Sequence, residues 1–264
     1  MRPALKIIPG RREVAAEKAV LETRGLSMVF PTGNGGLTVL EDVTFTAGAG
    51  EMVCILGPSG CGKSTLLKIL AGFLRPTGGA VLLGGKPVRR PGPERCVVFQ
   101  EDALFPWLTV AENIAFGLKS RVRDRKARRA EVDRYLELVG LTAFGDYLPR
   151  DISGGMKQRV ALARVLILQP RVLLMDEPFA ALDAQTRSEM QDLLLRLWGR
   201  FRHTVLFVTH DVTEAAILAD RILVMDRDPG RVRGVVPVPL ERPRRTESDA
   251  FHSFYREFRR GLRY

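Results

Sequence analysis

One stretch constrains this chain more than any other: Gly57-Pro58-Ser59-Gly60-Cys61-Gly62-Lys63-Ser64-Thr65. It matches G-x-x-x-x-G-K-[ST], the loop whose backbone N–H groups cradle phosphates. The apolar run 52–56 before it is typical of a buried strand, and the leucine-rich run 66–70 after it has helical spacing. This order of strand, loop and helix predicts a nucleotide site. In it, Lys63 reaches the β- and γ-phosphates and the Ser64 hydroxyl binds Mg²⁺.

The length and composition allow one large α/β domain, or a domain with a subdomain. The chain has 264 residues, of which 45% are hydrophobic, so it can bury a substantial core. No segment reaches the roughly 18 consecutive apolar residues of a membrane span. Residues 1–20 are charged throughout and lack the apolar stretch of a signal peptide. We therefore expect a cytosolic protein with a basic N-terminal leader.

The formal net charge of +11 favours polyanionic partners: nucleotide, nucleic acid or an anionic membrane surface. The basic residues concentrate at 89–95, 121–129 and the C-terminus. The first two clusters have no interleaved aromatic residues, so solvated faces explain them at least as well as a nucleic-acid site. Cys54, Cys61 and Cys96 form neither a disulfide framework nor a metal-binding pattern, and we interpret them as reduced thiols.

Turn signals and apolar patterning divide the first third of the chain into strands. Residues 21–30 and 39–45 have β-type patterning, and the Pro- and Gly-rich stretch 31–36 between them predicts a hairpin or a loop. Phe30 lies at the end of the first of these strands. It could stack on a nucleotide base or serve as a core or edge aromatic.

Polar side chains follow three predicted strands. Gln100 follows the apolar run 96–99, Asp176-Glu177 follows 172–175, and His210 comes just after 204–208. Open α/β sheets bind ligands at the carboxyl ends of their strands, so these side chains are candidates for the nucleotide site. An acid after such a strand assists Mg²⁺, and the next carboxylate could act as a general base. A lone histidine such as His210 could instead be structural.

Residues 101–150 change in character and predict helices inserted into the sheet domain. Ser153-Gly154-Gly155 then begins an amphipathic helix, and Ser153 is a good N-cap. Such a start is either a second anion site or a simple cap. At the other end of the chain, Phe251, Phe254, Tyr255, Phe258 and Leu262 share one helical face. We interpret that face as packing against the domain rather than as a membrane anchor.

Taken together, the phosphate loop, Gln100, Ser153-Gly154-Gly155, Asp176-Glu177, Asp183 and His210 occur in the order seen in one family. The chain resembles the ATP-binding subunit of ABC transporters over about residues 21–240. The resemblance implies an α/β fold: a P-loop NTPase (RecA-like) core with an antiparallel β subdomain and an inserted helical subdomain. The expected domain covers 21–244, with the helical subdomain at about 102–158 and a basic tail at 245–264.

The resemblance also implies roles for single residues. Phe30 matches the aromatic that stacks on adenine, and Gln100 the glutamine that contacts Mg²⁺ and senses the helical subdomain. Glu177 matches the general base, His210 the γ-phosphate switch and Asp183 the residue that joins the two sites of a dimer. Mg²⁺ would be held by Ser64, Gln100 and Asp176, and catalysis would rest on Lys63, Glu177 and His210.

The family further implies assembly. Ser153, Gly154 and Gly155 match the signature that closes on the γ-phosphate held by a second subunit, so two copies form a head-to-tail dimer around two ATP molecules. Such subunits lie on the cytoplasmic face of the inner membrane, bound to a permease that a solute-binding protein serves. The segment around Trp107 lies where the family contacts the permease. No nucleic-acid partner is expected.

Finer motifs indicate a branch of the family. The signature has Ile152 and Met156 where leucine and glutamine are commonest, and S-G-G-M resembles the nitrate, sulfonate and taurine importers. The expected function is therefore ATP hydrolysis that drives uptake of a small anionic solute. The alternatives are a soluble ABC ATPase that acts on ribosomes or nucleic acid, and a P-loop small-molecule kinase. The first usually has two cassettes or a long coiled-coil insertion, and the second lacks the signature.

Overall fold

The computed structural model describes residues 19–33, 35–99 and 104–262. The chain divides into two compact units, each of which is described by itself. Unit 1 comprises the residues up to Gly92 and those from Thr204 onward, and unit 2 comprises Pro93–His203. Gln100, which we predict to follow a strand, lies outside the described residues.

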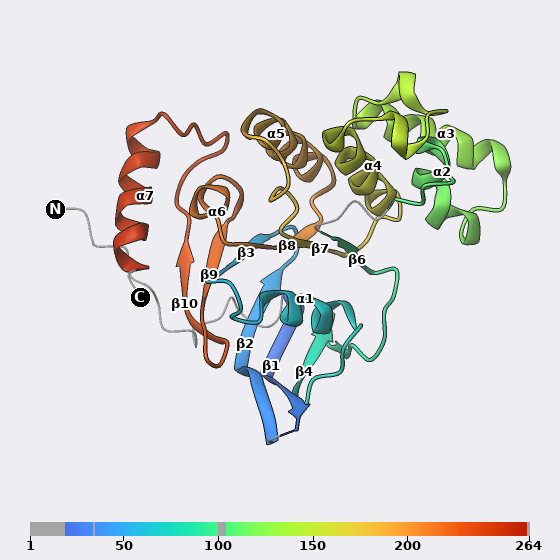
Figure 1. The fold of residues 1–264 in the computed structure, drawn as a ribbon. Coiled ribbons are helices and arrows are strands. Elements are labelled where there is room, and N and C mark those ends of the chain that lie inside the picture. The colour runs from blue at the N-terminus through green and yellow to red at the C-terminus, as the bar shows by residue number, and fades with distance from the viewer. Residues whose placement is uncertain (1–18, 34, 100–103, 263–264) are drawn as a thin grey trace. The chain divides into compact units, whose positions relative to one another are not determined.

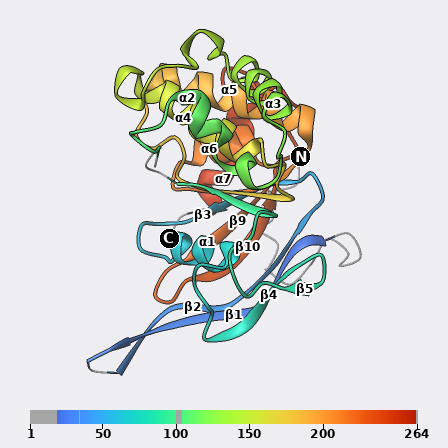
Figure 2. The same ribbon diagram turned by 90° about the vertical axis from the view of Figure 1, so that its right-hand side faces the viewer.

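Unit 1 contains an antiparallel sheet with the strand order β2-β1-β4-β5. Its strands are β1 (Ala19–Thr32), β2 (Gly35–Gly48), β4 (Gly78–Leu83) and β5 (Lys86–Pro87). The predicted hairpin is present as the long β1–β2 ribbon seen in Figure 2. The first strand starts at Ala19, inside the segment 1–20 that we expected to precede the domain. This sheet corresponds to the antiparallel part of the expected fold.

A second set of strands forms the core of unit 1, in the order β10-β9-β3-β8. They are β3 (Met52–Leu56), β8 (Thr204–Thr209), β9 (Arg221–Asp226) and β10 (Arg231–Pro237). β3 runs parallel to both β8 and β9, and β10 is antiparallel to β9. β3 and β8 are buried along their whole length, which explains their continuous apolar sequences.

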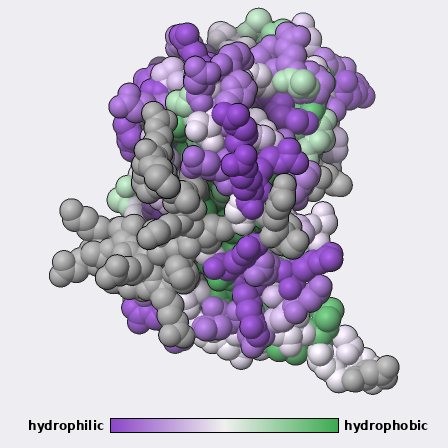
Figure 3. Space-filling view, turned by 90° about the vertical axis from the view of Figure 1, so that its left-hand side faces the viewer, coloured by the Kyte–Doolittle hydropathy of each residue, from purple (hydrophilic) through white to green (hydrophobic). Residues whose placement is uncertain are grey.

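The helices that the structure describes in unit 1 are α1 (Lys63–Ala71), α6 (Val212–Leu218) and α7 (Asp249–Gly261). α7 begins at the N-cap Ser248 and packs against α6 (Figure 1). Its residues Phe251, Phe254 and Phe258 are buried, so the predicted packing role of this apolar face is confirmed. His252, Arg256, Arg259 and Arg260 are exposed, and much of the coloured surface in Figure 3 is hydrophilic.

Unit 2 pairs the parallel strands β6 (Arg95–Val98) and β7 (Val172–Asp176). Its helices are α2 (Val110–Ala115), η2 (Phe116–Ser120), α3 (Arg125–Leu138), η3 (Thr142–Phe144), η4 (Pro149–Asp151), α4 (Gly154–Leu166) and α5 (Ala184–Phe201). The predicted helical region is therefore present. A capping box between Thr109 and Glu112 starts α2. Within the described ranges, no helix combines the length and apolar character needed to cross a membrane.

The cysteines are free thiols, as predicted. Cys54 lies in β3, Cys61 in the loop after it and Cys96 in β6. Burial raises the pKa of each thiol above its ordinary value. Since the thiolate is the reactive form, a raised pKa disfavours reaction of these thiols at neutral pH.

Candidate nucleotide site

The phosphate loop lies between β3 and α1 in unit 1. Residues 57–62 form the loop, and Lys63, Ser64 and Thr65 form the first turn of α1. Lys63 is only 5% exposed, and its Nζ donates to the carbonyl oxygens of Gly57 at 2.8 Å and Pro58 at 2.9 Å. A buried ammonium needs such acceptors. The loop therefore curls around its own lysine and keeps that cation at the N-terminus of a helix, where anions bind favourably.

Strand β2 and the β9–β10 hairpin pack closely against this loop. A Cβ on Gly62 would lie 2.7 Å from the Leu40 side chain, and one on Gly57 would lie 2.9 Å from the Met225 carbonyl. Gly230, in the turn between β9 and β10, is closer still: its Cβ would lie 2.2 Å from the Cys61 carbonyl oxygen. Gly230 also exchanges backbone hydrogen bonds with β2, donating to Val39 and accepting from Glu41.

Sequence reasoning missed Gly230 as a support of the site. The Asp228-Pro229-Gly230 stretch, with its turn-forming residues, was the available signal. It indicates a hairpin, but not what the hairpin touches.

Gly230→Ala is expected to destabilise the loop, because the added methyl group would overlap backbone rather than a movable side chain. Overpacking of this kind costs about 1–3 kcal/mol in the free energy of unfolding. ATP affinity should fall as well, since the displaced atoms belong to the phosphate loop. Chemical denaturation and ATP titration measure the two effects.

The matched control for this substitution is Gly33→Ala. A Cβ at Gly33 meets no atom of the described chain within 4 Å. The control should therefore change the free energy of unfolding by less than about 0.5 kcal/mol. Wild-type stability and wild-type ATP affinity in Gly230→Ala would contradict the bracing role.

His210 follows the end of β8, next to the phosphate loop. Leu56, the last residue of β3, pairs in register with Thr209, the last residue of β8. Gly57 and His210 therefore leave adjacent parallel strands at the same edge of the sheet. His210 is exposed, whereas Thr209 is buried and donates its hydroxyl to the Glu214 carboxylate at 2.7 Å.

Phe30 lies in the β1–β2 hairpin of the same unit. It pairs with Leu37 across the hairpin and is half-buried. Part of its ring therefore faces solvent, which a base-stacking role requires. A purely structural aromatic on a ribbon would have the same exposure.

In unit 2 the signature residues form the start of α4. Ser153 is the N-cap, and its Oγ accepts a hydrogen bond from the Met156 N–H at 3.3 Å, as predicted. Gly154 and Gly155 form the first turn, and Ser153 and Gly154 are exposed. The N-terminal end of this helix thus faces outward with its favourable partial charge for an anion.

Asp176 and Glu177 lie where β7 ends. Asp176 is the last residue of the strand, and both side chains are half-buried. Glu177 has a φ of 44°, in the left-handed region that non-glycine residues rarely adopt. A non-glycine backbone held in this region is strained, and strain of this kind gathers at functional sites.

Asp183 caps α5 and lies next to the signature through one neighbour, Thr186. The Asp183 carboxylate accepts from the Thr186 backbone N–H at 3.0 Å and from its hydroxyl at 2.7 Å. These hydrogen bonds hold the pKa of Asp183 below its ordinary value. A Cβ on Gly155 would lie 2.6 Å from the Thr186 methyl group. Thr186, which sequence reasoning missed, therefore connects the α5 cap with the first turn of α4.

The candidate residues thus fall into two groups. Unit 1 brings together the phosphate loop and His210, and it also contains Phe30 on the β1–β2 hairpin. Unit 2 places Gly155 and Asp183 next to Thr186, Ser153 at the N-cap of the helix that Gly155 begins, and Asp176-Glu177 at the end of β7.

Comparison with known proteins shows which proteins this chain is similar to. A family model described as ABC transporter matches residues 40–180. A nitrate import ATP-binding protein of Synechococcus elongatus is 48% identical over 222 residues, covering 83% of this chain and 81% of the relative. A bicarbonate transport ATP-binding protein of Synechocystis is 48% identical over 230 residues, covering 86% and 81%. A taurine import ATP-binding protein of Pelagibacter ubique is 49% identical over 221 residues, covering 83% of each.

Solved structures of ABC cassettes have a similar fold. A dimeric bacterial ABC transporter cassette superposes with a TM-score of 0.74 at 30% identity, covering 84% of this chain and all of that chain. A dimeric cassette in a post-hydrolysis state, bound to ADP and phosphate, gives a TM-score of 0.72 at 29% identity over 84% of this chain and all of that chain.

Proposed function

The chain belongs to the ABC transporter family of ATP-binding proteins, and from this premise we propose that it energises uptake of a small anionic solute through a separate permease. The protein is an ATPase with the fold of an ABC cassette. One observation supports the catalytic part most strongly: the loop that holds the buried Lys63 and the exposed His210 follow adjacent parallel strands at one sheet edge. A loop that only turned the chain would not need a buried cation there.

We assign the steps of hydrolysis to this chain's own residues. Water attacks the γ-phosphorus of ATP, the bond from that phosphorus to the β,γ-bridging oxygen breaks, and ADP and phosphate leave. The Glu177 carboxylate accepts the proton of the attacking water. Lys63 and the N–H groups at the start of α1 stabilise the negative charge on the phosphates, and His210 orients the γ-phosphate. Phe30 stacks on adenine.

We propose that oxygen donors of this chain hold Mg²⁺, a hard cation that prefers such ligands. Ser64 would contribute a hydroxyl from the first turn of α1, and Asp176 a half-buried carboxylate from the end of β7. Gln100 would contribute an amide oxygen. When bound, Mg²⁺ neutralises charge that develops on the phosphates.

The signature residues of one copy would close on the nucleotide of another. Both solved cassettes cited above are dimeric, and the exposed N-terminus of α4 suits a γ-phosphate. In this arrangement a monomer binds ATP without hydrolysing it. Asp183, linked to the signature through Thr186, would join the two sites of the dimer.

Ser153→Asp tests the composite site without removing the helix cap. Aspartate caps a helix as well as serine does, so α4 should keep its start while a negative charge faces the γ-phosphate. We expect ATP hydrolysis to fall at least about 10-fold, with ATP binding to the monomer unchanged.

The matched control is Ser248→Asp, which makes the same change at the N-cap of α7. It should leave hydrolysis within about twofold of the wild type. Equal rates for Ser153→Asp and the wild type would contradict the composite site.

Our proposals for the permease contact and for the solute rest on the similarity to these relatives. Their printed names specify nitrate, bicarbonate and taurine. In unit 2, Trp107 is 73% exposed and Phe116 is 48% exposed, so an aromatic surface is available for a membrane partner. We propose that the protein lies on the cytoplasmic face of the inner membrane, with a solute-binding protein delivering the solute to the permease.

Uptake by the reconstituted complex tests this function. The ATPase, its permease and its binding protein are placed in vesicles with ATP on the ATPase side, and nitrate, bicarbonate, taurine and sulfonates are compared. We expect ATP-dependent uptake of one of these solutes. Co-purification with ribosomes or DNA in place of a permease would overturn the proposal and favour a soluble ABC ATPase.

A further inference from the structure

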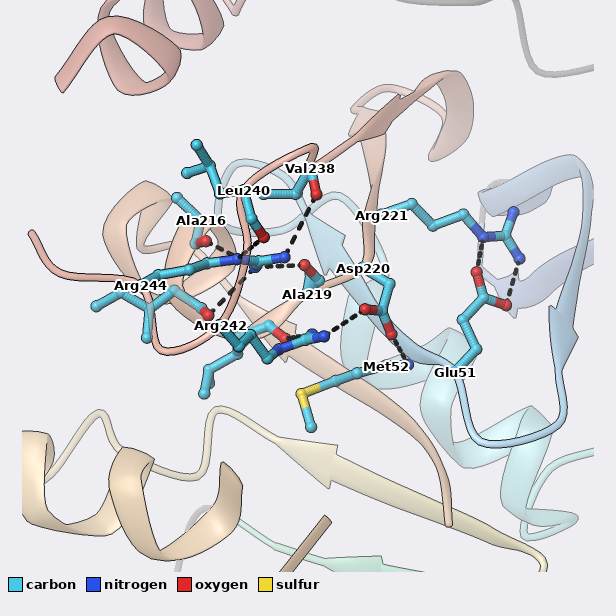
Figure 4. Close-up of polar contacts among 12 residues, drawn as sticks. Glu51, Met52, Ala216, Ala219, Asp220, Arg221, Val238, Leu240, Arg242 and Arg244 are labelled. Carbon is cyan, nitrogen blue, oxygen red and sulfur yellow. Dashed lines mark hydrogen bonds and ion pairs between the residues drawn. The ribbon is translucent and has the colours of Figure 1, made fainter. Parts of the chain in front are cut away.

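The C-terminal end of α6 is capped by two arginines that come from the segment after β10. Arg244 donates to the carbonyl oxygens of Ala216 at 2.9 Å, Ile217 at 3.2 Å and Ala219 at 2.6 Å. Arg242 donates to the carbonyl of Leu218. These four carbonyls are the ones that a helix ending here leaves without an intrahelical partner, so the two guanidinium groups satisfy the whole end of the helix (Figure 4).

The two arginines are themselves held in place. Arg244 also donates to Leu240 at 2.9 Å and Val238 at 3.3 Å. Burial, followed by the nearby charge of Arg242, lowers the pKa of Arg244 to about 10, so the group stays charged at neutral pH. Arg242 pairs with Asp220, whose other carboxylate oxygen accepts from the Met52 N–H at 2.8 Å. The cap is thereby tied to the start of β3, the strand that leads into the phosphate loop.

Hydrogen bonds connect the first turn of α6 with Thr209 and Asp211, the residues on either side of His210. The Asp211 carboxylate accepts from the Thr213 N–H at 2.6 Å and the Glu214 N–H at 3.2 Å. The Thr209 hydroxyl donates to the buried Glu214 carboxylate and accepts from the Asp211 N–H at 3.0 Å. The position of His210 is therefore coupled to the position of the first turn of α6.

α6 has only seven residues. Helices this short are unstable alone and depend on caps and packing. Its packing comes in part from α7, whose apolar face is buried, and α7 belongs to the same C-terminal segment as the arginines. Because α6 has only about two turns, a displacement of its C-terminal end would also move its N-terminal end.

We propose that Arg242 and Arg244, with α7, are a positioning device for His210. The arginines clamp the far end of α6, and the helix holds the histidine at the edge of the phosphate loop in the orientation that hydrolysis requires. This inference rests on the role of His210 given under the proposed function. It assigns the C-terminal segment to turnover rather than to nucleotide binding, because no residue of the loop takes part in the clamp.

The test compares Arg244→Gln and Arg244→Lys with Arg245→Gln, a change at the exposed neighbouring arginine. Glutamine has neither the charge nor the reach, and lysine keeps the charge with fewer donors. We expect kcat to fall about 10-fold in Arg244→Gln and about threefold in Arg244→Lys. The KM for ATP should stay within about twofold in both, and Arg245→Gln should match the wild type.

Two further measurements separate positioning from general stability. First, in single turnovers of a His210→Ala background, adding Arg244→Gln should change the residual rate by less than about twofold, because the device then has no histidine to position. Second, the chain has three histidines, so histidine-selective NMR can follow each imidazole. Arg244→Gln should shift the His210 signal and leave that of His203, which belongs to unit 2, unchanged.

The proposal is overturned if folded Arg244→Gln has wild-type kcat and an unmoved His210 signal, or if its loss of rate is undiminished in the His210→Ala background. Should Arg244→Gln fail to fold, Arg244→Lys decides by the same readouts. The NMR shift is measured without nucleotide. If the wild type hydrolyses no ATP, the proposed function fails, while the shift still reports whether the clamp reaches His210.

Discussion

Glu177→Gln is expected to lower kcat for ATP hydrolysis at least about 100-fold, the lower end of what a positioned general base contributes. The amide keeps the shape of the side chain but cannot accept a proton from the attacking water. ATP binding should persist, because the proposed phosphate contacts come from the loop around Lys63. The two quantities are measured separately, kcat by phosphate release and affinity by calorimetric titration of ATP.

Glu137→Gln provides the control for Glu177→Gln. It makes the same change at an exposed position of α3 in the same unit, and it should leave kcat within about twofold of the wild type. A kcat for Glu177→Gln that matches this control would remove Glu177 from the assigned role and leave another group to activate the water.

Lys63→Ala is expected to abolish measurable hydrolysis and to weaken ATP binding by at least about 10-fold, since hydrogen bonds to charged groups contribute about 1.5–3 kcal/mol each. The substitution also removes the donor of the Gly57 and Pro58 carbonyls. The loop should therefore lose both its cation and part of its shape, and the free energy of unfolding should fall.

Lys68→Ala is the matched control on the same helix. Lys68 is exposed in the last turn of α1, and its loss should alter neither ATP affinity nor kcat by more than about twofold. If Lys63→Ala bound ATP as tightly as Lys68→Ala does, the phosphate-binding role of Lys63 would have to be abandoned.

Local patterns were sufficient to predict much of the fold. The run Met52–Leu56 is a buried strand and Ser153 is a helix cap, as expected. Both follow from short-range rules: a strand buried on both faces needs an unbroken apolar run, and a helix start needs a side-chain acceptor for its first N–H groups. The roles of the site residues remain predictions, and Gln100 lies outside the described residues.

The supports of the site could not be predicted in the same way. Gly230 touches the loop across 169 positions of sequence (230 − 61), and Arg244 reaches α6 from 25 positions beyond its C-cap (244 − 219). A glycine in a turn and an arginine in a basic tail have ordinary local explanations. No neighbouring residue in the sequence indicates which part of the backbone Gly230 or Arg244 will contact.

Sequence reasoning alone was enough to recognise the family and its motifs: a phosphate loop with its lysine, carboxylates after a strand and a glycine-rich helix start. These depend on residue types at close spacing, where covalent geometry restricts what the chain can do. Only the tertiary structure decided that Lys63 is held by its own loop, that Gly230 braces that loop, and that Arg242 and Arg244 cap the helix after His210. Such contacts arise from burial, which brings distant backbone carbonyls and cations together once the core has formed.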